Sequence, residues 1–108
     1  MLITEKPWGK EILITVQEKY MVKKLYMNKD ARCSLQYHVH KTETVYVLSG
    51  LLLLTCDKNT ITLSPGDSYT IHAGTIHRME GLEDTVYLEA STPENDDVVR
   101  VEDDYGRE

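Results

Sequence analysis

The sequence predicts an all-β fold of the jelly-roll type, in which short antiparallel strands form a barrel or sandwich around one core. Runs rich in Val, Ile, Tyr, Thr and Leu recur along the 108-residue chain, with turn-forming residues between them every ~8 to 12 residues. No segment of about 11 residues or more keeps the apolar period of a helix. A chain of this length can form one core but not a two-domain nucleotide enzyme, so residues 1–108 are predicted to form a single domain.

Nine strands are expected, because β-branched, aromatic and leucine side chains suit a pleated, half-buried surface. In chain order they are 11–16, 20–27, 34–40, 44–48, 51–56, 60–63, 68–72, 76–80 and 85–91. Turn formers stand between them at 28–30, 49–50, 57–59, 64–67, 73–74 and 81–84. The four consecutive leucines that begin at Leu51, directly after Gly50, predict a buried strand.

The composition is that of an ordinary folded protein, with 41% hydrophobic and 28% charged residues. No apolar run approaches the ~18 residues of a membrane span, and the first residues lack a basic stretch followed by an apolar one. We therefore expect a cytoplasmic protein without membrane partners. Its two cysteines, Cys33 and Cys56, are expected to be thiols in that compartment.

The charge is unevenly placed along the chain. The net charge is −6, yet residues 80–108 hold 11 acidic and 2 basic side chains, whereas residues 1–79 carry a net +3. The acidic end argues against nucleic acid or an anionic membrane as partner, and the cationic part leaves room for a small anion. Arg100 lies in the acidic stretch and is expected to pair with an acid there, such as Asp97, Glu102 or Asp103.

All four histidines fall in two short segments, which predicts a metal site. His38 and His40 are two residues apart, so on one strand both imidazoles point to the same face. Glu43 follows three residues after the pair, and His77 comes from a distant strand. Three imidazoles and one carboxylate suit one divalent ion, Mn, Fe, Co, Ni or Zn, and leave coordination positions open for a substrate.

Two motifs resemble those of the cupin superfamily. The first is His38-x-His40, then Glu43, then six residues to Gly50. The second begins at Gly66 and continues through His72 and Gly74 to His77. This resemblance implies a cupin barrel whose metal ligands are His38, His40, Glu43 and His77.

The flanking segments resemble the cupin domain of type II mannose-6-phosphate isomerases. They are KPWGKE at 6–11, SLQYHVHKTE at 34–43, HRME at 77–80 and STPENDDVVRVEDDYGR at 91–107. The chain departs from that family at Lys41, where the family has Arg, and at Thr44 and Val45, where His and Trp are common. The resemblance implies a metal-dependent isomerase acting on a phosphorylated or activated sugar.

Interconverting an aldose and a ketose phosphate requires removing a proton beside a carbonyl, with a metal to stabilise the enediolate. His72 is the candidate for the base or for a residue that supports a metal ligand from behind, because it stands where cupins usually have a proline. Lys41 and Arg78 are the candidate contacts to the phosphate. Strand alternation places Arg78 on the opposite face from His77, which argues against its role.

Two other functions fit the same residues. Three His and one Glu also suit a metal-dependent oxygenase, and a cupin can hold a sugar or an acid without turning it over. A homodimer is expected, because small cupins often pair through sheet edges and an exposed edge strand invites pairing.

Overall fold

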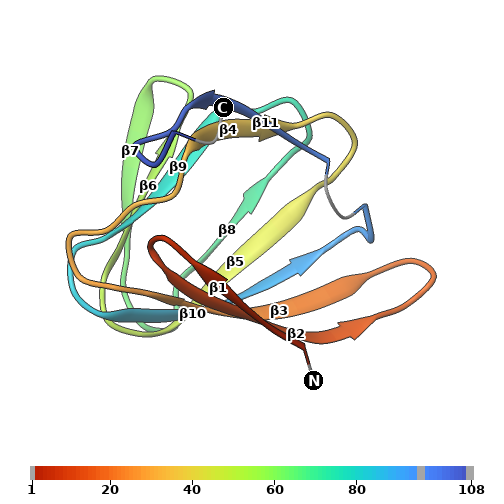
Figure 1. Cartoon of the computed structure of the whole chain (residues 1–108), viewed down its shortest axis with the longest axis horizontal. Coiled ribbons are helices and arrows are strands. Elements are labelled where there is room, and N and C mark those ends of the chain that lie inside the picture. Colours follow the sequence, from red (N-terminus) through yellow and green to blue (C-terminus); the bar gives the residue numbers. More distant parts are fainter. Residues whose placement is uncertain (1, 95–96, 107–108) are drawn as a thin grey trace.

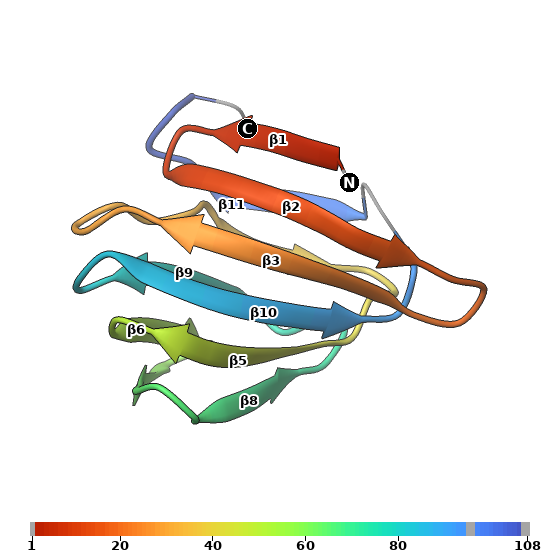
Figure 2. The ribbon, with the colours of Figure 1, turned by 90° about the horizontal axis from the view of Figure 1, so that it is seen from below.

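The computed structural model describes residues 2–94 and 97–106, which form two antiparallel sheets facing each other (Figure 1). The six-stranded sheet has the order β1 (Leu2–Lys6), β2 (Gly9–Val16), β3 (Met21–Met27), β10 (Thr85–Ser91), β5 (Glu43–Ser49), β8 (Ser68–Ile71). The five-stranded sheet has the order β11 (Val98–Glu102), β4 (Leu35–His38), β9 (His77–Gly81), β6 (Leu52–Cys56), β7 (Asn59–Leu63). Figure 2 shows the six-stranded sheet in front of the other.

This architecture confirms the predicted all-β jelly roll. The described residues contain no helix, and therefore none long and apolar enough to cross a membrane. Among the described residues, no hydrogen-bonded strand pair joins the two sheets into a continuous barrel.

The core lies between the sheets and is filled by alternate residues of the facing strands. Val45 and Val47 from β5 and Leu52 and Leu54 from β6 are fully buried. Leu53, between the two buried leucines, is only half-buried, so the leucine run at 51–54 packs one face inward. Burial of such apolar surface is the main force that holds the two sheets together.

All nine predicted strands are present, with most ends shifted by one or two residues and one misplaced in a way that affects the site. The prediction that residues 34–40 form one strand is wrong, because β4 ends at His38. The carboxylate of Asp97 accepts hydrogen bonds from the backbone N–H groups of Val39, His40 and Lys41, at 3.2, 2.7 and 2.9 Å. These bonds replace the strand ladder and turn the chain away from the sheet.

Two strands, β1 and β11, were not predicted. β1 pairs with β2 through a tight connection that contains Trp8, which is buried. Gly9 follows with φ of 154°, and a Cβ there would lie 1.8 Å from the carbonyl oxygen of Tyr26. Only glycine fits this close approach, which packs the β1–β2 hairpin and Trp8 against the cavity between the sheets.

Candidate metal centre

Three buried side chains from three strands meet at one end of the cavity. His38 ends β4, Glu43 begins β5 and His77 begins β9, and their potential ligand atoms all lie within 4.8 Å of one another. Glu43 Oε1 is 3.1 Å from His77 Nε2 and 3.6 Å from His38 Nε2. The residues are only 0 to 6% exposed, so water does not solvate them freely.

The backbone orients both rings. His77 Nδ1 lies 2.9 Å from the carbonyl oxygen of Thr75, and His38 Nδ1 lies 3.3 Å from that of Asp97. Because a carbonyl can only accept, each Nδ1 carries the proton, and in the neutral ring each Nε2 has a free lone pair. Both lone pairs therefore point toward the Glu43 carboxylate, as in a site whose ligands are held by hydrogen bonds behind them.

This arrangement leaves buried polar atoms without partners. Both carboxylate oxygens of Glu43 and Nε2 of His77 accept or donate no hydrogen bond of acceptable geometry. Buried, unpaired lone pairs are costly unless something satisfies them. A divalent cation does so for all of them at once, so the cluster fits a metal of the kind that binds imidazole and carboxylate.

Burial and charged neighbours shift the pKa values of the ionisable side chains at this end of the cavity. Burial by itself would raise the pKa of Glu43, but its polar neighbours, among them the cationic Lys41, hold that pKa well below its usual range. Burial alone would lower the pKa of Lys41, yet Glu89 and Glu43, each 3.6 Å from its Nζ, raise it. Burial and the charge of Glu43 raise the pKa of Glu89 to about 8.

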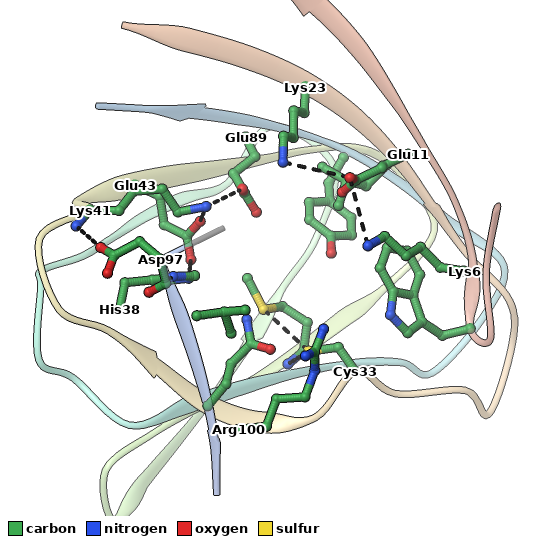
Figure 3. A pocket seen from close by; sticks show the side chains of 16 residues that line it. Lys6, Glu11, Lys23, Cys33, His38, Lys41, Glu43, Glu89, Asp97 and Arg100 are labelled. Atoms are coloured by element: carbon green, nitrogen blue, oxygen red, sulfur yellow. Dashed lines mark hydrogen bonds and ion pairs between the residues drawn. The ribbon is translucent and has the colours of Figure 1, made fainter. Parts of the chain in front are cut away.

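A pocket of about 150 Å³ adjoins the cluster and is lined by residues of both sheets (Figure 3). His38, Glu43, Lys41 and Glu89 line it, together with Trp8 from the β1–β2 connection. A ligand in this pocket therefore contacts the proposed metal site and a set of charged side chains at the same time.

The structure brings together some of the predicted site residues and not others. His38, Glu43 and His77 form the cluster, and Lys41 lies beside it. His40 is exposed and outside the cluster, since β4 ends before it; the interpretation that it shares a strand face with His38 is wrong. Its role as a fourth ligand stays a prediction.

The other two candidates do not line the pocket. His72 is exposed, directly after the end of β8. Arg78 is buried, but its Nε donates to the carbonyl of Cys33 at 2.9 Å and its guanidinium faces Asp104 at 3.8 Å. Strand alternation thus directs Arg78 away from His77, and its role as a phosphate contact stays a prediction.

Sequence reasoning missed several charged residues of the pocket, among them Lys23 and Glu89. Lys23 alternates with buried Met21 and Leu25 on β3, and Glu89 follows buried Tyr87 by two residues on β10. Both residues could have been recognised in the sequence as charged residues at inward-facing positions of otherwise apolar strands. A charge at such a position marks a residue that the interior must accommodate with a partner or a ligand.

This chain is similar in sequence to a known protein family and to segments of longer proteins. The family model described as "Mannose-6-phosphate isomerase C-terminal" matches residues 3–103. The alginate biosynthesis protein AlgA of Pseudomonas aeruginosa is 34% identical over 107 residues, covering 94% of this chain and 22% of AlgA. The mannose-1-phosphate guanylyltransferase ManC of Salmonella typhimurium has the same identity and coverage. The chain thus spans about a fifth of the length of these relatives.

A solved structure shows the same fold. An RmlC-like cupin from Shewanella frigidimarina superposes with a TM-score of 0.80 and 21% identity, over 89% of this chain and 86% of that one. The cupin resemblance of the two histidine motifs is therefore confirmed at the level of fold. Since the family model covers nearly the whole sequence, the chain belongs to the mannose-6-phosphate isomerase C-terminal family.

Proposed function

We propose that His38, Glu43 and His77 bind one divalent metal ion. The observation that carries this proposal is the convergence of potential ligand atoms from three buried side chains, with neither oxygen of Glu43 in a hydrogen bond. Backbone carbonyls behind the two Nδ1 atoms hold both rings so that each Nε2 faces Glu43. The donor set fits Mn, Fe, Co, Ni or Zn.

The reaction we propose is the interconversion of an aldose phosphate and a ketose phosphate. The family to which the chain belongs and the named relatives, which include a mannose-1-phosphate guanylyltransferase, support a sugar phosphate as substrate. When bound, the metal would polarise the carbonyl and hydroxyl oxygens, which makes the neighbouring C–H more acidic. The pocket residues then have to orient the sugar and move one proton between adjacent carbons.

Glu89 is the residue that we assign to this proton transfer. It lines the pocket on β10, and its Oε1 is 3.6 Å from Lys41 Nζ, which is itself 3.6 Å from Glu43. Lys41 has no lone pair while it is protonated, so its part is to hold the two carboxyl groups in place and offset their charge. His72, the candidate from sequence, does not line the pocket.

Proton NMR in deuterated water tests the reaction directly. Metal-reconstituted protein is incubated with mannose 6-phosphate, fructose 6-phosphate or glucose 6-phosphate, and the metal content is measured on the same sample. We expect deuterium at C1 or C2 of one sugar, lost in His38→Ala together with the metal. Glu89→Gln should keep the metal and lose most of the exchange, by about 100-fold or more. Metal-loaded wild type that exchanges none of these sugars contradicts the isomerase proposal.

A further inference from the structure

The charged side chains that line the pocket are nearly all paired with one another. Four of them are cations outside the histidines: Lys6, Lys23, Lys41 and Arg100. Lys41 pairs with Glu43 and Glu89, as described above. Lys6 and Lys23 both face Glu11, at 3.9 and 3.6 Å, in a second group that Figure 3 shows apart from the Glu43 group.

Arg100 is the exception. Within residues 2–94 and 97–106 the structure gives its guanidinium no acidic partner, and its Nε is buried without a hydrogen bond. Two of the acids expected to pair with it do not do so. The carboxylate of Asp97 binds three backbone N–H groups, and the side chain of Glu102 is exposed. A buried guanidinium N–H without an acceptor is costly, so the structure leaves a place for an anion.

Strand register aims Arg100 at the metal end of the same pocket. Arg100 is the cross-strand partner of Gln36, and Gln36 is the partner of His77. Cross-strand partners project from the same face of a sheet, so Arg100, Gln36 and His77 all project from one face. Two strand spacings separate the first from the last, about 10 Å between Cα atoms.

Gln36 stands between the two ends with a fixed orientation. The hydroxyl of Ser34, which is fully buried, donates to Gln36 Oε1 at 2.6 Å. The oxygen of the amide is thereby engaged, and its NH₂ group is the part left to serve a ligand. His77 of the proposed metal site, the amide NH₂ group of Gln36 and the guanidinium of Arg100 therefore follow one another across the five-stranded sheet.

We propose that Arg100 binds the phosphate of a sugar phosphate whose carbonyl end lies at the His38–Glu43–His77 cluster. This inference rests on the proposed function and specifies which end of the substrate each part of the pocket takes. A guanidinium presents paired N–H donors that match phosphate oxygens, and Arg100 is the one lining cation among the described residues with no acid to satisfy it. Arg100 thus takes the role that the sequence suggested for Arg78.

The test measures binding rather than turnover. Metal-loaded wild type, Arg100→Gln and Arg100→Lys are titrated calorimetrically with fructose 6-phosphate and with fructose. We expect wild type to bind the phosphate ester more tightly than the free sugar, and Arg100→Gln to bind the ester about 10- to 100-fold more weakly than wild type does. Arg100→Lys should fall between them, because an ammonium keeps the charge but not the paired donors.

The matched control is Arg32→Gln, an exposed arginine that pairs with Asp104 and does not line the pocket. Its affinity for the ester should equal that of wild type. Equal affinity of wild type and folded Arg100→Gln for fructose 6-phosphate overturns the proposal, and so does wild type that does not prefer the ester over fructose. Preferential binding that depends on Arg100, without deuterium exchange, supports the anion site while contradicting the isomerase reaction.

Discussion

At the scale of single residues, the cluster is defined by where its protons are. Each histidine places its Nδ1 against a backbone carbonyl, so in the neutral rings the atoms that face Glu43 are acceptors facing an acceptor. In a metal-free protein this arrangement costs free energy, because desolvated lone pairs repel. Proteins keep such arrangements where function requires them, and metal coordination is the simplest function for these three groups.

The metal assignment predicts which histidines control metal content. His38→Ala and His77→Ala should lower metal affinity by more than about tenfold, because each removes a ligand. His72→Ala should leave metal content unchanged, since its side chain is exposed and outside the cluster. Inductively coupled plasma mass spectrometry after dialysis measures all of these variants.

The variant His40→Ala tests whether His40 is a fourth metal ligand, as the sequence predicts, or lies outside the site, as the structure indicates. If His40 is a fourth ligand, its removal lowers metal content as His38→Ala does. If three ligands suffice, as the exposed position of His40 indicates, the variant keeps its metal. Full occupancy in both His38→Ala and His77→Ala would contradict the metal centre itself.

Asp97 predicts an acid-dependent loss of stability. Hydrogen bonds from the backbone N–H groups of His40, Lys41 and Val39 lower the pKa of its carboxyl. A lowered pKa in the folded state stabilises the protein above the unfolded-state pKa, about 3.9, and the effect disappears as the pH falls through the folded-state pKa. Asp97→Asn should therefore unfold at a lower temperature than wild type at pH ~7, and the difference should vanish near pH ~2.

Differential scanning fluorimetry across this pH range measures the effect. The control is Asp30→Asn, an exposed aspartate for which the structure shows no side-chain hydrogen bond among the described residues. A melting difference between Asp97→Asn and wild type that stays constant from neutral to acid pH would show that the charge of Asp97 is not its source.

At the scale of elements, β11 forms one edge of the five-stranded sheet. Together with Asp97, the residue before it, β11 also shapes the pocket. Asp97 ends the ladder of β4 at His38, and Arg100 on β11 enters the pocket. No strand was predicted at 98–102, where two of the five residues are charged. The pairing of β11 with β4, about sixty residues earlier, fixes both features.

Arg78 on β9 is predicted to be structural. Its Nε donates to the carbonyl of Cys33 and its Nη2 lies 3.4 Å from the carbonyl of Glu102, so it connects β9 to the segment before β4 and to the end of β11. Arg78→Met should cost about 1 to 3 kcal/mol of unfolding free energy, because a buried carbonyl loses its donor. Urea unfolding measures this loss.

The variant Arg78→Met also tests whether Arg78 contributes to phosphate binding or only to stability. Folded Arg78→Met should bind fructose 6-phosphate as wild type does, in contrast to Arg100→Gln. Normal stability combined with lost phosphate binding would restore Arg78 as the anion contact.

At the scale of the whole molecule, the two sheets create one cavity with chemically different ends. The cluster lies where β4, β5 and β9 meet, and the Lys6–Glu11–Lys23 group lies on strands β1 to β3. Because both sheets contribute, any change in their separation alters the pocket. The N-terminal hairpin is therefore part of the site, although its sequence contains no ligand motif.

The edge of the six-stranded sheet supports the predicted homodimer. β1 is the terminal strand of that sheet, and its Leu2 and Ile3 side chains are 61% and 52% exposed. An exposed apolar edge strand is a common pairing surface. Size-exclusion chromatography with light scattering should show a dimer for wild type and a monomer for Ile3→Lys.

The matched control for the dimer is Val99→Lys, an exposed valine on β11 at the edge of the other sheet. That variant should remain dimeric. A monomeric wild type at micromolar concentration would show that the exposed edge does not mediate self-association.

The sequence by itself determined the fold class, nine of the strands and three of the residues that form the cluster. It could do so because strand alternation, turn formers and the choice of imidazole and carboxylate are local properties. Tertiary structure alone decided that His40 leaves the strand, that Arg78 faces away, and that Lys23, Glu89 and Arg100 reach the pocket. These outcomes depend on contacts between distant segments, such as His40 with Asp97, 57 residues apart, which no local pattern encodes.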